Sequence, residues 1–114
     1  MNSRVRSILG HMLEGAQDAI TFAGEVKTAE AFATNKLHRK AVIMSILNIG
    51  ELAKNLPPEF KAVHTQIPWK KIAGMWDVAA HGYHIMDDEI IWDVVNYSIP
   101  ELVCFIEVYL EKNN

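Results

Sequence analysis

Residues 37–56 constrain the fold most, because they have the apolar spacing of a long helix and stop at a double proline. Apolar side chains recur there every three or four residues, which places them on one stripe of a helix. Pro57 and Pro58 end the helix, since proline lacks a backbone N–H and clashes with the preceding turn. We expect this helix to be the most buried one, with Gly50 allowing a neighbour to approach closely. The stripe consists of Val42, Ile46, Ile49, Ala53 and Leu56.

The same spacing predicts three more long helices. The first is amphipathic and ends near Gly24, the second follows Ile67 and Pro68, and the last covers residues 88–109. Pro100 lies inside the last helix and is expected to kink it.

Polar residues mark the starts of other elements. Asp87 or Asp88 is expected to cap the last helix, and Thr34 with Asn35 offers a cap for the helix before the double proline. Short helical turns are predicted at residues 28–32 and 58–63, and no strand alternation, repeat or low-complexity tract occurs. The prediction is an all-α fold: an antiparallel helical bundle of four main helices plus short helical turns, as a single domain over residues 1–114.

Size and composition favour a dimer. Half of the 114 residues are hydrophobic, and a domain of this size buries only a modest core, so pairing with a second copy would add stability. Cys104 is the only cysteine and stands in an apolar run, where we expect it to pack as a small apolar side chain. It excludes an internal disulfide and fits a reducing cytoplasm. No apolar run approaches membrane-spanning length, so we expect an unprocessed protein without a membrane partner.

The formal charge of −3 argues against a protein that coats nucleic acid through its overall charge. Local basic patches could still form and bind phosphate. The residues available for them are Arg4, Arg6, Arg39, Lys40, Lys70 and Lys71.

The segment over residues 76–84 is the best candidate for a functional site, because it places polar side chains where a helix runs into a glycine turn. His81 can act as a general acid or base, or it can bond the last carbonyls of the helix. Tyr83 can present a hydroxyl for modification, or it can pack the turn against the bundle. On a helical wheel His81 lies on the polar side with Asp77, and Trp76 lies on the apolar side.

Other candidates have weaker support. Glu51 either supplies a carboxylate to a nearby site or lies on a solvated edge. Lys70 and Lys71 either contact phosphate or are simply solvated. His81 and His84, with an aspartate nearby, match none of the specific zinc spacings, so we expect no metal and no other cofactor.

Five stretches together make the chain similar to the HepT-like branch of the HEPN proteins, helical domains encoded beside minimal nucleotidyltransferases. They are residues 39–42, 47–51, 67–75, 81–83 and 89–92. The resemblance implies a homodimeric ribonuclease toxin that cuts RNA, tRNA included, without metal. It also implies a cognate minimal nucleotidyltransferase antitoxin, similar to MntA, that silences the toxin by AMPylation.

Carried over by position, the resemblance makes His81 the catalytic histidine and Tyr83 the target of AMP transfer. The family arginine and its asparagine neighbour fall at positions occupied by Trp76 and Asp77. An arginine would hold the reacting phosphate with a permanent charge, so its loss predicts a weakened ribonuclease. The basic side chains we expect to substitute are Lys70, Lys71 and, from the other protomer, Arg39.

The missing arginine leaves a second function open. A catalytically inactive HEPN adaptor would bind a nucleotidyltransferase partner or a nucleotide instead of cleaving RNA. Trp76 and Asp77 favour the adaptor, whereas the intact 81–83 stretch favours the ribonuclease or its regulation. We take His81 and Asp77 as candidate catalytic residues. The candidate substrate contacts are Trp76, Lys70, Lys71, Arg39 and Glu51.

Overall fold

The computed structural model describes residues 3–82 and 87–113, and for residues 78–81 it describes the helical backbone only. Within these ranges the chain is helical and contains no strand. The elements are α1 (Ser3–Gly24), α2 (Ala29–Thr34), α3 (Lys36–Lys54), α4 (Pro58–Val63), α5 (Trp69–Gly82), α6 (Asp88–Asp93), the π-helical segment η2 (Val94–Ser98) and α7 (Ile99–Lys112). The predicted all-α bundle of four main helices plus short turns is confirmed.

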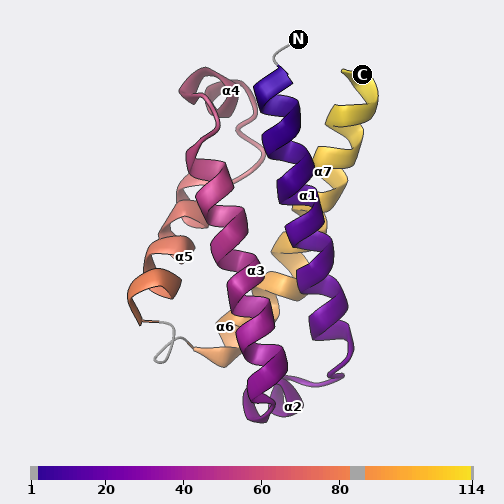
Figure 1. Cartoon of the computed structure of the whole chain (residues 1–114), viewed down its shortest axis with the longest axis vertical. Coiled ribbons are helices and arrows are strands. Elements are labelled where there is room, and N and C mark those ends of the chain that lie inside the picture. The colour runs from indigo at the N-terminus through magenta and orange to yellow at the C-terminus, as the bar shows by residue number, and fades with distance from the viewer. Residues whose placement is uncertain (1–2, 83–86, 114) are drawn as a thin grey trace.

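The main helices run antiparallel to their neighbours (Figure 1). Helix α1 lies between α3 and α7, and α3 lies between α1 and α5. Short α2 and α6 close the lower end in Figure 1, while α4 lies at the upper end near both termini. None of the helices in the described part of the chain is long and apolar enough to cross a membrane.

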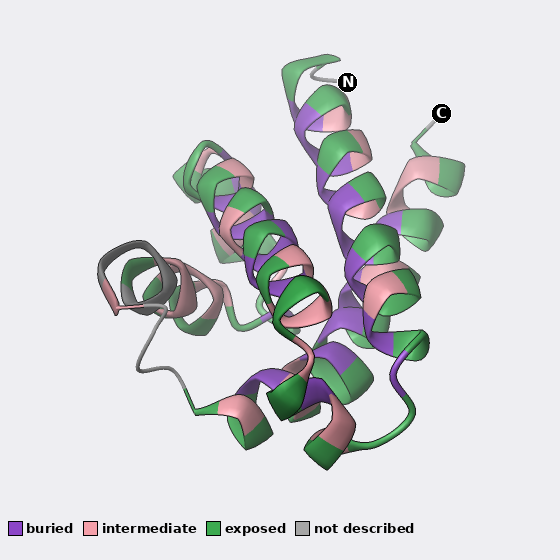
Figure 2. Ribbon diagram, turned by 60° about the horizontal axis from the view of Figure 1, so that its bottom comes forward, coloured by how far each residue is buried: buried purple, intermediate pink, exposed green. Residues whose placement is uncertain are grey.

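The core lies along the inward faces of these helices, where purple runs along the ribbons in Figure 2. One cluster fills the end near the termini and includes Leu9, Leu56 and Ile106. A second cluster fills the opposite end around Phe32 and Ile91, both of which are fully buried. All five side chains of the predicted stripe are buried, four of them in α3 and Leu56 just after its end.

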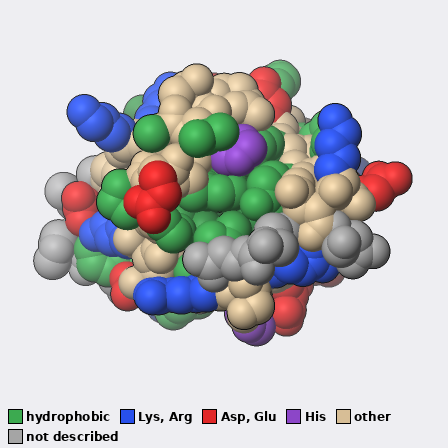
Figure 3. Space-filling view, turned by 90° about the horizontal axis from the view of Figure 1, so that it is seen from above, with side chains coloured by type: hydrophobic (Ala, Val, Ile, Leu, Met, Phe, Trp, Pro, Cys, Tyr) green, Lys and Arg blue, Asp and Glu red, His purple; other side chains and the backbone are tan. Residues whose placement is uncertain are grey.

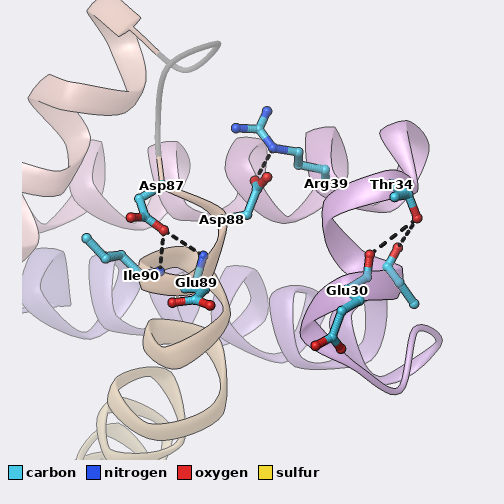
Figure 4. A network of polar contacts seen from close by, with 8 residues as sticks. Glu30, Thr34, Arg39, Asp87, Asp88, Glu89 and Ile90 are labelled. Carbon is cyan, nitrogen blue, oxygen red and sulfur yellow. Dashed lines mark hydrogen bonds and ion pairs between the residues drawn. The ribbon is translucent and has the colours of Figure 1, made fainter.

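The caps predicted at Asn35 and Asp87 are present, and Thr28 caps α2 in addition. The Thr28 side chain accepts a hydrogen bond from the Ala31 N–H (3.1 Å), and the Asn35 side chain accepts one from the His38 N–H (3.1 Å). Asp87 is the N-cap of α6 and accepts from the Glu89 N–H at 2.9 Å (Figure 4). Each cap satisfies a backbone donor that the first helical turn leaves without an intrahelical partner.

Helix α3 ends at Lys54, two residues before the predicted end at Leu56. The N–H groups of Asn55 and Leu56 bond carbonyls three residues back, at 3.0 and 3.2 Å. A residue before proline avoids the helical conformation, so the chain leaves the helix before it reaches Pro57.

Pro100 changes the backbone hydrogen bonding of the helical turn that precedes it. It has no N–H for the carbonyl of Asn96, and the neighbouring Ile99 N–H bonds the carbonyl of Val94, five residues back. The expected irregularity therefore takes the form of the π-helical segment η2, between α6 and α7.

The prediction for Cys104 is wrong, because its side chain is exposed. It lines an open groove between α7 and the connection from α4 to α5, together with His64, Phe105 and Tyr109. Hydrophobic side chains gather over this end of the bundle (Figure 3). Consecutive residues of a helix are about 100° apart, so Cys104 faces away from the buried side chain of Leu102 although the whole run is apolar.

Candidate active site

The start of α5 is anchored to the connection that precedes it. The indole N–H of Trp69 donates to the carbonyl of His64 (2.9 Å), and the Ile72 N–H donates to the carbonyl of Pro68 (3.1 Å). The ring of Trp69 also packs at 6.0 Å from the ring of Phe60, between centroids. These contacts fix where α5 begins, and the helix then continues to Gly82.

Helices α3 and α5 meet at Gly50 and Trp76. A Cβ added at Gly50 would lie 2.5 Å from the Cβ of Trp76 and 3.1 Å from two of its ring atoms. Any larger residue at position 50 would therefore force the helices apart. The close neighbour expected at Gly50 is thus confirmed, and it is Trp76, a residue of the candidate site.

Lys54 completes a three-residue cluster at this contact. Its Nζ atom lies 3.4 Å from the centroid of the Trp76 ring and 3.1 Å from Oδ1 of Asp77. The side chain of Lys54 is 36% exposed and that of Asp77 is 60% exposed. A cation from the end of α3 is therefore held against α5 by an aromatic ring and a carboxylate, both of which stabilise positive charge.

The position of His81 lies one turn beyond Asp77 on the same helix. Residues four apart in a helix share a face, and the backbone is helical from Trp69 to Gly82. The side chain of His81 lies outside the described residues, as does the whole of Tyr83, so their assigned roles stay predictions.

The other predicted site residues are not brought to this cluster. Arg39 pairs through Nε with Asp88 at the start of α6 (Figure 4). Lys71 lines an apolar cavity of about 70 Å³ between α3, α5 and α7. Lys70 and Glu51 are exposed, and neither forms an ion pair with Lys54 or Asp77 in the described part of the structure.

Sequence reasoning missed Lys54. It follows the polar residues of α3 and looks like a solvated helix-end lysine, which is the usual reading of such a residue. Its partner Asp77 is 23 residues away along the chain, so no local pattern links them. Two indirect signals were present: Gly50 one turn earlier in α3, and an acidic residue beside Trp76.

Comparison with known proteins places the chain in a family. Residues 12–109 match the family described as "Ribonuclease HepT-like". No solved structure matches the chain.

Relatives of nearly the same length support this match. "Putative RNase MJ0127" of Methanocaldococcus jannaschii is 40% identical over 90% of this chain and 84% of its own length. "Putative RNase TTE0752" of Caldanaerobacter subterraneus subsp. tengcongensis is 36% identical over 94% of this chain and 95% of its own length. "Probable ribonuclease HepT" of Thermococcus cleftensis is 40% identical over 64% of this chain and 66% of its own length. The HepT-like resemblance is confirmed, and the chain belongs to the ribonuclease HepT-like family.

Proposed function

We propose that this chain is a metal-independent RNA endonuclease in which His81 is the general base. The observation that carries the proposal is the family match over residues 12–109, which includes the whole of α5. Relatives named as RNases align with nearly the full chain, so the likeness is not confined to one motif.

The reaction requires no group beyond RNA and this protein. His81 accepts the proton of a ribose 2′-hydroxyl, and the 2′-oxygen attacks the adjacent phosphorus. The bond from phosphorus to the 5′-oxygen breaks, and that oxygen takes up a proton as it leaves. The products are a 2′,3′-cyclic phosphate and a 5′-hydroxyl, and a nearby cation stabilises the charge that develops on the phosphate.

We also propose the biological setting implied by the resemblance: a homodimeric toxin that acts on RNA such as tRNA and is silenced by a minimal nucleotidyltransferase. Tyr83 follows Gly82, the last residue of α5, and would accept AMP on its hydroxyl. An adduct two residues from His81 would add negative charge and bulk beside the site, which explains how modification would stop cleavage.

A second candidate function is the inactive adaptor, and the contact between Trp76 and Gly50 favours it. Trp76 serves helix packing at the position where the family has its arginine, and Asp77 adds negative charge nearby. An adaptor would bind the nucleotidyltransferase or a nucleotide and leave RNA intact.

Cleavage assays separate the two functions. We expect the purified protein to cleave single-stranded RNA or tRNA in the presence of EDTA and to leave cyclic phosphate ends. His81→Ala should reduce the rate by about a hundredfold or more. His11→Ala is the matched control, because His11 is exposed on α1 and should leave the rate unchanged.

Two results would contradict the ribonuclease. One is intact RNA after incubation with folded wild-type protein, and the other is equal cleavage by wild type and His81→Ala. If the folded protein cleaves no RNA yet binds a minimal nucleotidyltransferase in a pull-down, the adaptor replaces the enzyme.

A further inference from the structure

The ammonium group of Lys54 is held in place by two neighbours and keeps donor capacity for a further hydrogen bond. It contacts the Trp76 ring at 3.4 Å and donates to Oδ1 of Asp77 at 3.1 Å. An ammonium has three N–H donors, Asp77 and the Trp76 ring engage at most two of them, and the Lys54 side chain is 36% exposed. Lys54 is therefore an oriented cation that an incoming anion can reach.

The ion pair between Lys54 and Asp77 adds little to folding stability. The Asp77 carboxylate is 60% exposed, and ion pairs between exposed groups contribute little to folding. A phosphate that approaches Lys54 competes with a well-solvated carboxylate. The free energy needed for the ammonium to bind the phosphate beside Asp77, or in its place, is therefore small. The ring of Trp76 keeps the ammonium in position during such an exchange, because the close contact with Gly50 fixes Trp76 against α3.

The location of the cation relates it to the proposed reaction. Asp77 and position 81 are one turn apart in α5, a rise of about 6 Å along the helix axis. Lys54 contacts the first of these residues from α3, so its ammonium lies beside the helix face that carries His81. One nucleotide unit is long enough to bridge the two positions.

We propose that Lys54 is a substrate-binding residue that contacts a backbone phosphate of single-stranded RNA, with Asp77 and Trp76 as its positioning residues. The inference rests on the proposed function, because it takes RNA as the substrate. It assigns the phosphate contact to α3, in place of a side chain from α5. The basic residues suggested by sequence, including Lys70 and Lys71, are then not needed for this contact.

Binding is measured apart from cleavage by using the His81→Ala background, in which the RNA stays intact. A fluorescently labelled single-stranded RNA is titrated with protein, and its anisotropy is recorded at several salt concentrations. The variants are Lys54→Ala, Lys54→Gln, Lys54→Arg and the control Lys36→Ala. Lys36 is an exposed lysine at the opposite end of α3, so its loss changes the net charge by the same amount.

We expect Lys54→Ala and Lys54→Gln to weaken binding about fivefold or more. Each should also lower the slope of log affinity against log salt by about 0.7, the value for one phosphate contact on a single strand. Lys54→Arg should retain most of the affinity and Lys36→Ala nearly all of it. Circular dichroism checks the fold, and Lys54→Gln keeps most of the aliphatic stem if Lys54→Ala unfolds.

Three results would overturn the inference: no RNA binding, equal binding by the Lys54 variants and their parent, or an equal loss in Lys36→Ala. Cleavage assays with His81 present distinguish this failure from failure of the proposed function. If cleavage depends on His81 but not on Lys54, the function stands and the role of Lys54 is wrong. If binding depends on Lys54 but no cleavage occurs, the role of Lys54 stands and the enzyme is wrong.

Discussion

Gly50 of α3 and Trp76 of α5 approach so closely that one methyl group at Gly50 would lie 2.5 Å from the Cβ of Trp76. This contact sets both the separation and the register of the two helices. Because Lys54 is one turn beyond Gly50 in α3, the same register brings its ammonium over the Trp76 ring. The packing of two helices and the placement of one cation thus depend on a single glycine.

Gly50→Ala is expected to destabilise the protein by about 1–3 kcal/mol, because the new methyl group has no room and α3 must move from α5. Gly74→Ala is the control, since nothing lies within 4 Å of a Cβ added there. That control should be neutral or stabilising by up to about 1 kcal/mol, the helix propensity gained over glycine. Urea unfolding monitored by circular dichroism measures both, and equal stabilities for the two variants would contradict the close contact.

The ion pair between Arg39 and Asp88 is expected to stabilise the start of α6. Their side chains are 16% and 31% exposed, so the pair is screened less than one on the surface. Arg39→Ala should lower the free energy of unfolding by about 1–2 kcal/mol. In the Arg39→Ala background, Asp88→Ala should lower it by less than it does in the wild type. A double-mutant cycle by thermal or urea unfolding measures the coupling, and strictly additive losses would show that the pair contributes nothing.

Cys104 is expected to react with a thiol reagent in the native protein. Its side chain is exposed beside an open groove, so the reagent needs no unfolding to reach it. A chromogenic disulfide reagent should label one thiol per chain, at a rate unchanged by low urea concentrations. Cys104→Ser should give no signal, and labelling that appears only above the unfolding transition would mean that the thiol is covered in solution.

Tyr83 is expected to accept AMP from a cognate minimal nucleotidyltransferase supplied with ATP. Mass spectrometry of the wild type should show one added AMP per chain, and the Tyr83→Phe variant should show none. Tyr97, which is 71% exposed, provides the control, because Tyr97→Phe should still be modified. Equal labelling of wild type and Tyr83→Phe would remove Tyr83 from the proposed regulation.

Sequence patterns predicted the fold well because helix ends are local events. Asp87 and the double proline at 57 and 58 act on backbone groups within one turn, so the local sequence is enough to predict these helix ends. The exposure of Cys104 was misjudged because an apolar run was treated as uniformly buried, although a helix turns part of every run outward.

The candidate site was only partly accessible to the same reasoning. The stretch of α5 that contributes Trp76 and Asp77 was singled out from the sequence, and Trp76 was correctly assigned to the packed side of the helix. Lys54 was not found, because its contact with Asp77 depends on the register of α3 against α5. That register is set by side-chain packing at Gly50, which periodicity within one helix does not reveal.

The π-helical segment between α6 and α7 also limits how the length of this region can vary. Ile91 is fully buried before it, and Ile106 is fully buried after it. Deleting one residue from Val94–Ser98 would allow a regular α-helix but would rotate Ile91 by about 100° relative to α7. Ile91 would then leave its place beside Phe32 in the second core cluster. Natural variants of this chain should therefore change residues in this segment far more readily than they insert or delete them.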